Sequence, residues 1–342
     1  MRLFAEAGYQ AHFWPDNLHY DRPNARLLQD MGVEVLYGPQ LSGRFADWMK
    51  VAGPHLSHVL LSRPDVASRY LSDVRAHTRA PVSYYGHDLH FARLELEHRT
   101  SGRPEIADEA ARLKALETQV WSKVDTVFYP TQDEVDIVRR MAPETAADVM
   151  PAFAFEPAEL AAADAAAPEA RAGLLFVGGF RHGPNVDGLI WFVREVLPLV
   201  AAAHPHVRLD VVGSNATDEV TALASHHVRI LGFVSDDDLA RLYASTRTVV
   251  APLRFGAGVK GKVIEAFRFG VPVATTSVGA QGIDARGALS VADEPHALAA
   301  RIKTLLDDDA AWLRQSHAAA AFVREAYGQA NVARHLSRYF PG

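Results

Sequence analysis

The sequence predicts an α/β protein built from two doubly wound halves. Short apolar runs alternate with helical patterns along the chain, which is typical of parallel sheets covered by helices on both faces. Two such series follow one another, and a length of 342 residues fits two domains. The stretch from Pro151 to Arg171 lies between the two series, is rich in alanine at its centre, and is typical of a linker.

The strands of the first series are the apolar runs Gln10–Pro15, Val33–Tyr37, His58–Ser62, Val82–Tyr85 and Thr126–Pro130. Those of the second series are Leu174–Gly178, Arg208–Gly213, Val228–Leu231, Thr248–Pro252, Val271–Thr276 and Leu289–Val291. The last stretch, Asp307–Phe340, carries an apolar face that indicates one or two helices.

These elements predict two Rossmann-like domains. We expect an N-terminal, acceptor-side domain over residues 1–155, joined by a C-terminal helix over 318–342, and a nucleotide-binding domain over 170–317. A doubly wound domain should begin with a strand and a glycine turn. Here Arg2–Glu6 has the pattern of a helix tail that stops at Gly8, so we expect the first strand of the N-terminal domain to be missing.

Composition excludes several classes of function. The chain has no cysteine, which excludes disulfides and thiolate metal sites and fits a reducing cytosol. Its net charge is −6 and neither half is basic, so we expect no nucleic-acid partner. No apolar run reaches the roughly 20 residues of a membrane-spanning helix, and the opening lacks the apolar core of a signal peptide. We therefore expect a cytoplasmic protein.

The richest candidate segment runs from Pro252 to Phe267, between a predicted strand and a predicted helix. Gly256, Gly258 and Gly261 favour positive φ and close approach to a ligand, and the helix start favours an anion. Lys260 and Lys262 add positive charge at this point, so phosphate is the expected anion. One turn further on, the carboxylate of Glu265 can accept two hydrogen bonds from a ribose diol. A flexible glycine turn with solvated lysines is the alternative interpretation.

A second candidate segment follows the strand that ends at Gly178 and Gly179. In open α/β sheets, ligands bind beyond the carboxyl ends of the strands, so Arg181, His182 and Asn185 are placed to face one. The segment lacks the Gly-Lys-Ser/Thr of a phosphate-binding Walker motif. A purely structural turn explains this segment equally well.

The third candidate segment is Val82–His90, again directly after a strand. His87 could donate a hydrogen bond to a sugar hydroxyl or steer a reacting group. A structural histidine is the alternative. The sequence offers no further ligands to complete a metal site with His87 and His90, so we expect no metal.

The second half resembles the retaining glycosyltransferases of family 4, in glycosyltransferase group 1, which have the GT-B fold. The resemblance is strong from Leu174 to Ile283 and weaker over residues 55–150, where His87-Asp88-Leu89 and Pro130–Glu134 resemble family segments. In the strong region the matching segments follow in family order and spacing: Phe176–Gly179, Leu231–Val234, Val250–Leu253, Gly258–Ala266, Gly270–Ala274 and Gly279–Ile283.

The resemblance implies two Rossmann-like domains that face a cleft, with the donor bound mainly by the second domain. It implies that Glu265 binds the ribose and that His87 lies beside the donor sugar. The first glutamate of the family pair falls at Ala257, so backbone amides from Ala257 to Val259 are implied to contact the sugar hydroxyls.

The family's diphosphate-binding arginine and lysine fall at Gly179 and Asn185. We expect Arg181, Lys260 and Lys262 to substitute for them. The implied catalytic set is therefore His87, Lys260 and Lys262. The implied donor-binding set is Gly178, Gly179, Arg181, Asn185, Gly256, Ala257, Gly258, Val259 and Glu265.

The implied function is transfer of a hexose-type sugar, with retention and without metal or cofactor, from a nucleoside-diphosphate sugar to a glycan, lipid-linked or protein acceptor. Polysaccharide biosynthesis and peripheral contact with the inner membrane face are compatible with such acceptors. The alternative is a non-catalytic GT-B-like binding module or one lobe of a larger assembly. The missing first strand and missing first glutamate favour that alternative, or an enzyme impaired in activity. A sugar-nucleotide epimerase of the same fold is a third interpretation.

Overall fold

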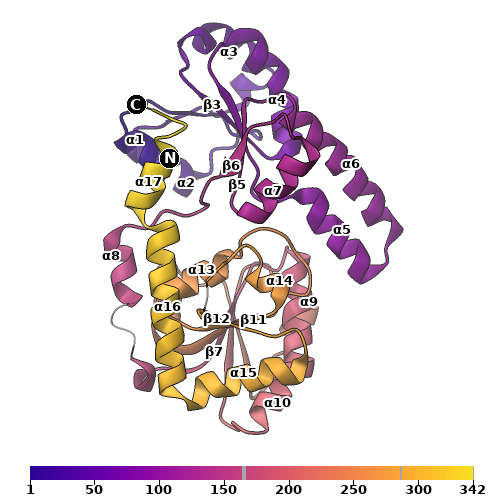
Figure 1. Ribbon diagram of the computed structural model, residues 1–342, viewed down its shortest axis with the longest axis vertical. Helices are drawn as coiled ribbons and strands as arrows, with labels where there is room; N and C mark the ends of the chain where they lie inside the picture. The colour runs from indigo at the N-terminus through magenta and orange to yellow at the C-terminus, as the bar shows by residue number, and fades with distance from the viewer. Residues whose placement is uncertain (164–166, 286, 342) are drawn as a thin grey trace. The chain divides into compact units, whose positions relative to one another are not determined.

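The chain divides into two compact units (Figure 1). The computed structural model describes residues 1–163, 167–285 and 287–341. The first unit comprises Met1–His87, Ala111–Met150 and Val332–Gly342, and the second comprises Asp88–Ala110 and Pro151–Asn331. Each unit contains its own parallel sheet.

The main sheet of the first unit has the strand order β3–β4–β5–β6, with every neighbouring pair parallel. Its strands are β3 (Val59–Ser62), β4 (Val82–Tyr85), β5 (Thr126–Tyr129) and β6 (Ala147–Val149). A separate parallel pair is formed by β1 (His12–Phe13) and β2 (Glu34–Val35). The helices of this unit are α1 (Arg2–Glu6), α2 (Arg22–Asp30), α3 (Phe45–Ala52), α4 (Pro64–His77), α7 (Gln132–Met141) and the greater part of α6 (Pro104–Trp121), with 3-10 turns η1 (Pro39–Leu41) and η2 (Gly53–His55).

The end of the chain packs into the first unit. The ring of Tyr339 lies edge-on to Phe128 of β5 at a centroid distance of 4.8 Å, and Phe340 is buried in the same cluster. The hydroxyl of Tyr9 donates to the carbonyl oxygen of Pro341 at 2.6 Å. These contacts fix the last residues against β5 and against the segment that follows α1.

The second unit has the strand order β12–β11–β10–β7–β8–β9. The strands are β7 (Ala172–Val177), β8 (Leu209–Val212), β9 (Val228–Gly232), β10 (Thr246–Ala251), β11 (Val273–Thr275) and β12 (Leu289–Val291). Its helices are α5 (His90–Ser101), α8 (Pro157–Leu160), α9 (Gly183–Trp191), α10 (Leu197–Ala201), α11 (Asp218–Thr221), α12 (Asp236–Ser245), α13 (Gly261–Arg268), α14 (Ser277–Ala280), α15 (Pro295–Asp307) and α16 (Asp309–Tyr327). The helix α17 (Gln329–Leu336) follows, and the short turns are η3 (Ala161–Ala163), η4 (Pro168–Ala170) and the π-helical η5 (Phe192–Val196).

Both faces of this sheet are buried, as parallel sheets require. Along β7, Leu174 and Phe176 pack into one apolar cluster, whereas Leu175 between them packs into the other. The first cluster takes in α9, η5 and α15, and the second takes in α12, α13 and α16. Figure 1 shows α9 and α16 on opposite sides of the sheet. The continuous apolar runs of the sequence therefore correspond to strands that are covered twice.

The predicted strands are all present, with ends that shift by a few residues. The strand β6 was not predicted, because its three residues include the charged Asp148 and carry no apolar run. The boundary expected at residue 318 also differs from the observed one. The side chains of Ala319, Val323 and Tyr327 in α16 are buried in the core of the second unit, so only Val332–Gly342 belongs to the first. In the described part of the chain, no helix combines the length and apolarity that a membrane crossing needs.

Candidate functional site

The candidate site lies where the strand order of the second unit reverses. From β7 the chain proceeds through β8 to β9 on one side, and from β10 it proceeds through β11 to β12 on the other. The strands β7 and β10 are neighbours, so the loops that follow them leave the sheet side by side. Open α/β sheets bind ligands at such a switch point. The two glycine-containing segments singled out in the sequence are these two loops.

A hydrogen-bond chain joins the two loops. The ammonium of Lys262, in the first turn of α13, donates to Oδ1 of Asn185 in α9 at 2.6 Å. The Nδ2 of Asn185 donates in turn to the carbonyl oxygen of Gly179 at 2.8 Å. Asn185 is buried, and the Lys262 ammonium also lies 4.5 Å from the ring centroid of Phe176 in β7. Residues 77 positions apart in sequence are thus tied into one structure at the sheet edge.

Close packing at this edge explains its glycines. A Cβ atom on Gly178 would lie 2.8 Å from Asn185 Cγ and 2.9 Å from Lys262 Nζ, too close for either to stay in place. A Cβ on Gly188 of α9 would lie 2.6 Å from the carbonyl oxygen of Pro252. Gly179 has room, because the nearest atom to its added Cβ is 3.8 Å away. Because Gly178 has no side chain, the space beside it is free for the side chains of Lys262 and Asn185.

The electrostatic environment of Lys262 is unusual. Burial, with the positive charge of Lys260 second, lowers the pKa of Lys262 to about 7. Partial burial and neighbouring cations, Lys262 among them, also lower the pKa of His182 at the start of α9. Positive charge on these side chains is therefore unfavourable in the free protein, and a bound anion would stabilise their charged forms. Arg181, which the sequence also placed here, is exposed.

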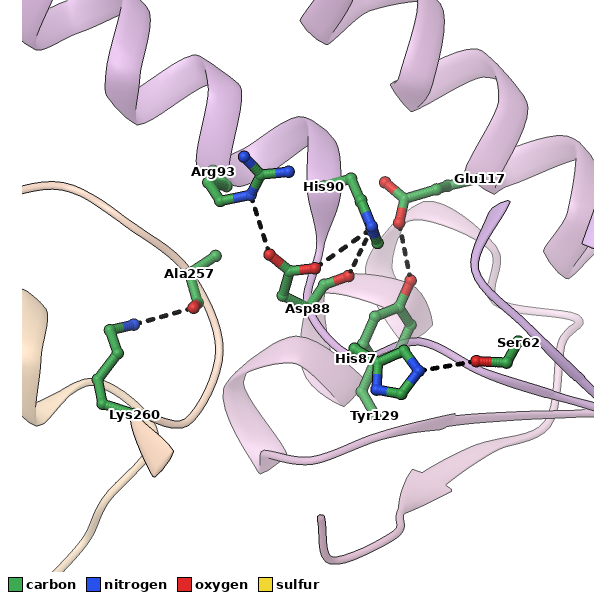
Figure 2. Close-up of polar contacts among 9 residues, drawn as sticks. All are labelled: Ser62, His87, Asp88, His90, Arg93, Glu117, Tyr129, Ala257 and Lys260. Carbon is green, nitrogen blue, oxygen red and sulfur yellow. Dashed lines mark hydrogen bonds and ion pairs between the residues drawn. The ribbon is translucent and has the colours of Figure 1, made fainter. Parts of the chain in front are cut away.

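Lys260 has a different position from Lys262. It is the N-cap residue of α13 and is buried, and its ammonium donates to the carbonyl oxygens of Ala257 at 2.9 Å and Gly258 at 2.6 Å. Figure 2 shows the lysine directed at the Ala257 carbonyl. These contacts of Lys260 shape the loop.

The Lys260 contacts also orient backbone amides. In a planar trans peptide the carbonyl and the following N–H point in opposite directions. Because the carbonyls of Ala257 and Gly258 point at Lys260, the N–H groups of Gly258 and Val259 point away from it. Gly256 and Gly258 have φ of +142° and +70°, which glycine adopts readily. Gly261, for which the sequence suggested the same freedom, lies in the helix without positive φ.

Glu265 lies on α13, in the turn after Lys262, and 39% of its side chain is exposed. Its Oε1 is 3.9 Å from Arg268 Nη1 on the same helix. Burial raises the pKa of Glu265, Arg268 lowers it, and the negative charge of Asp236 on α12 raises it. The carboxylate is neither locked in a short core ion pair nor fully solvated, so it can accept hydrogen bonds from a ligand.

His87 belongs to the first unit and directly follows the β4 strand and Gly86. Its Nε2 is 2.8 Å from the Ser62 hydroxyl at the end of β3 (Figure 2). The Tyr129 hydroxyl donates to the buried carboxylate of Glu117 at 3.1 Å, and its ring lies 2.2 Å from where a Cβ on Gly86 would be. Only glycine fits before His87, and the histidine is held in place by Ser62.

The neighbouring histidine, His90, contacts a carboxylate of its own loop. The carboxylate of Asp88 lies 3.3 Å from Nδ1 of His90 and accepts a hydrogen bond from Nε of Arg93 at 3.1 Å. Within the described residues no three histidine, aspartate or glutamate side chains gather as metal ligands. The polar groups of this loop are instead engaged with one another (Figure 2).

Sequence reasoning missed several residues around Glu265. Asp236 is the first residue of α12, whose N-cap side chain, Ser235, accepts a hydrogen bond from the amide of Asp238 at 3.2 Å. The negative charge of Asp236 also raises the pKa of Glu265. The i,i+3 spacing of Glu265 and Arg268 was a signal that could have been found. Asp236 and Tyr243 are more than 20 positions away from Glu265, and no local sequence pattern predicts that they lie near it.

A family model matches the segment that contains this candidate site. The model of the family Glycosyl transferases group 1 matches residues 171–308, which include β7, β10, α13 and every site residue described in the second unit apart from Asp88, His90 and Arg93. An uncharacterized 44.6 kDa protein in the cps region of Klebsiella pneumoniae is 30% identical over 116 residues. That alignment covers 32% of this chain and 30% of the Klebsiella protein, so it spans less than a third of either.

Solved structures share the fold over nearly the whole chain. Sucrose-phosphate synthase from Thermosynechococcus elongatus matches with a TM-score of 0.73 at 15% identity, over 99% of this chain and 90% of that one. Anabaena HepE, in complex with UDP and glucose, matches with 0.68 at 16% identity, over 99% and 94%. A glycosyltransferase from Rickettsia africae matches with 0.71 at 12% identity, over 99% and 92%. The predicted GT-B fold, with its two Rossmann-like units, is thereby confirmed.

Proposed function

We propose that this protein is a retaining glycosyltransferase, which moves a sugar from a nucleoside-diphosphate sugar to a glycan, lipid-linked or protein acceptor. One observation carries the proposal: Lys262 bonds to Asn185 at the switch point of the second sheet, in the first turn of α13, and the same helix carries Glu265 one turn further on. The match of residues 171–308 to Glycosyl transferases group 1 and the fold shared with HepE, solved with UDP and glucose, support it.

Each part of the donor has a matching group in this proposal. The diphosphate lies against the ammonium of Lys262 and the first amides of α13, where both charge and helix dipole favour an anion. The ribose diol donates to the carboxylate of Glu265. The N–H groups of Gly258 and Val259, turned outward by Lys260, donate to hydroxyls of the sugar. Gly178 and Gly179 allow the backbone to approach the diphosphate closely.

The reaction needs positive charge where the leaving group develops negative charge. The bond between the sugar C1 and the β-phosphate oxygen breaks, and the acceptor oxygen bonds to C1 from the same face. The acceptor proton passes to the departing phosphate oxygen. Lys262 and the helix amides stabilise the leaving diphosphate, which is the largest contribution available at this site. Because fixed protein charges do this work, we propose that the transfer needs no metal.

His87 is proposed to hydrogen-bond the transferred sugar. Its ring is oriented by Ser62, and the glycine before it is fixed by the Tyr129 ring. Replacing His87 with Ala should therefore lower kcat about tenfold, the cost of one hydrogen bond in the transition state, and leave the affinity for a nucleoside diphosphate unchanged.

The second candidate function is binding of a nucleotide sugar or glycan without catalysis. Ala257 occupies the position of the family's first glutamate, which favours this alternative. The two candidates differ in turnover, so one assay separates them. The purified protein is incubated with UDP-, GDP-, ADP- and dTDP-sugars and candidate glycan acceptors, and products are followed by mass spectrometry and anomeric NMR signals.

The expected result is transfer from at least one of these donors, with the anomeric configuration of the donor retained. Transfer with inversion would contradict the retaining assignment. Binding of a nucleotide sugar without hydrolysis or transfer, across all donors, would support the non-catalytic candidate instead. Interconversion of the donor sugar without an acceptor would identify an epimerase.

A further inference from the structure

The residue Tyr243, near the end of α12, has a buried hydroxyl. It shares a neighbour, Phe269, with Arg268, which lies 3.9 Å from the candidate ribose-binding carboxylate. Its side chain is fully buried, and its ring stacks on Phe269 with centroids 5.1 Å apart and planes 5° from parallel. Its carbonyl oxygen accepts a hydrogen bond from Nη1 of Arg171 at 2.7 Å. Both the ring and the backbone of Tyr243 are thus held rigidly.

The hydroxyl of Tyr243 is buried and has no hydrogen-bond partner among the described residues. A buried polar group without a partner costs free energy, so such a group calls for an explanation. The Arg268 guanidinium lies over the Phe269 ring on which Tyr243 stacks, and its Nη1 is 3.9 Å from Oε1 of Glu265. In line with this placement, burial and then the negative charge of Glu265 raise the pKa of Tyr243. A phenol hydroxyl is a donor, and a carboxylate is the acceptor that it would pair with most strongly.

A second donor converges on the same place. The guanidinium of Arg268 lies over the rings of Phe155 and Phe269, and its buried Nε also has no partner within the described part of the chain. Its Nη1 is 3.9 Å from Glu265 and 3.4 Å from Glu159. The charged groups that face Glu265 are therefore Arg268 on its own helix, Asp236 on α12 and, through Arg268, Glu159 on α8.

We infer that Tyr243 is a positioning residue, whose hydroxyl donates to the Glu265 carboxylate and aims it at the 2′,3′-diol of a bound ribonucleotide. This inference rests on the proposed function and adds a residue to it. Glu265 can turn from its long contact with Arg268 toward Tyr243, since part of its side chain is exposed and no short ion pair holds it. With one carboxylate oxygen held by the protein, the remaining lone pairs face the diol in a fixed direction.

A positioning role for Tyr243 can be distinguished from the space-filling role of the other buried aromatic residues of this core. A tyrosine that only fills space acts through its ring, so loss of the hydroxyl would change nothing in binding. A positioning tyrosine acts through Glu265 and the diol, so loss of the hydroxyl matters only for ligands that carry the diol. Tyr243→Phe removes the hydroxyl alone and keeps the stacked ring.

The experiment measures the Kd of UDP, GDP and ADP and of their 2′,3′-dideoxy counterparts by calorimetry. The proteins are wild type, Tyr243→Phe, Glu265→Ala and a control, Tyr327→Phe. Tyr327 is a buried tyrosine of the same cluster whose pKa is raised by burial alone, so it undergoes the same chemical change without a link to Glu265. Thermal unfolding of each variant is recorded alongside.

Wild type is expected to prefer the ribonucleotide over its dideoxy form, and Glu265→Ala to abolish that preference. Tyr243→Phe should weaken binding of the ribonucleotide about five- to tenfold and leave the dideoxy form unchanged, whereas Tyr327→Phe changes neither. The melting temperature of Tyr243→Phe should not fall, because an unpaired buried hydroxyl contributes no stability.

Three results would overturn the inference. If Tyr243→Phe keeps the full diol preference while Glu265→Ala loses it, Tyr243 does not position the carboxylate, and the proposed function stands. If Tyr243→Phe weakens both ligand forms equally, its role is structural. If wild type shows no diol preference, or Glu265→Ala retains it, the ribose assignment itself fails and the inference fails with it.

Discussion

At the scale of single residues, the two lysines of the loop have separate roles. The sequence places Lys260 and Lys262 together as positive charges for phosphate. In the structure Lys260 is buried against the carbonyls of its own loop, whereas the Lys262 ammonium lies over the loop that follows β7. The local sequence around the two lysines could not reveal this difference, because the partner of Lys262 is Asn185, which is far away in the sequence.

Lys262 predicts a pH dependence for nucleotide binding. With its pKa lowered to about 7, the lysine loses its proton as pH rises above 7 in the free protein. A bound diphosphate favours the charged form and raises that pKa, so binding takes up a proton. The affinity for UDP should therefore fall between pH 7 and pH 9, by up to about tenfold per pH unit, while the phosphates stay ionised.

Calorimetry in buffers of different ionisation enthalpy measures the affinity and the proton uptake together. Lys262→Gln should bind weakly at pH 7 and show neither the slope nor the uptake. Nearby ionisable groups are His182, whose pKa is lowered, and Lys260. His182→Gln is thus the control, and it should keep the slope above pH 7. A wild-type affinity that is flat from pH 7 to pH 9 would contradict the role of Lys262.

At the scale of elements, the loops after β7 and β10 depend on each other. Gly178 provides the space in which Asn185 and Lys262 meet, and the neighbouring Gly179 does not. Gly178→Ala should destabilise the protein by about 1–3 kcal/mol, because buried groups must shift to admit the methyl group. It should also weaken nucleotide binding by breaking the Lys262 contact.

Urea unfolding and the Kd of UDP measure both effects. The matched control is Gly179→Ala, where the added methyl has an ordinary distance of 3.8 Å to Ser214. Near wild-type stability is expected for the control. Equal losses of stability in the two variants would mean that the Asn185–Lys262 junction is not what the glycine protects.

The loop before α13 supports a further prediction about the sugar. Because Lys260 turns the amides of Gly258 and Val259 outward, Lys260→Met should disorganise the donors offered to the sugar. The affinity for the nucleotide sugar should fall about tenfold or more, and the affinity for the nucleoside diphosphate should fall much less. Lys262→Gln should weaken both ligands alike. Competition binding with the two ligands distinguishes these patterns, and parallel losses for Lys260→Met would refute its assigned role.

The sequence predicted the elements of this region well and their junctions poorly. The strands β7 and β10 are recognisable because both of their faces are buried, which makes each a continuous apolar run. The helix start near Lys260 was predicted correctly from the helical pattern that follows the glycines. The hydrogen bond between Asn185 and Lys262 depends on the order of the strands in the sheet, and so does the position of Tyr243 relative to α13. The alternation of apolar runs and helical patterns along the chain does not specify that order.

At the scale of the whole molecule, two parallel sheets of similar construction carry different numbers of candidate residues. The second unit holds the glycines, Lys262 and Glu265, whereas the first contributes His87 and its supports Ser62 and Tyr129. The sequence predicted this division because both series of strands alternate with helices. It did not predict that α16 packs in the second unit, because an apolar helix face does not indicate which domain it packs against.

The proposed charge arrangement predicts transfer without a metal ion. Lys262 and the α13 amides supply the positive charge that a divalent metal ion supplies in other reactions with a phosphate leaving group. Activity measured in excess EDTA should remain within about twofold of the untreated value. A loss of activity that magnesium or manganese restores would show that the protein's own charges do not suffice.

The most direct test of the account is a crystal structure of the protein with the nucleoside diphosphate that it binds most tightly. We expect the diphosphate at the start of α13 within hydrogen-bond distance of Lys262 Nζ, and both ribose hydroxyls on the carboxylate of Glu265. A nucleotide bound elsewhere, or one whose ribose leaves Glu265 untouched, would contradict the central claim that the loops after β7 and β10 form the donor site.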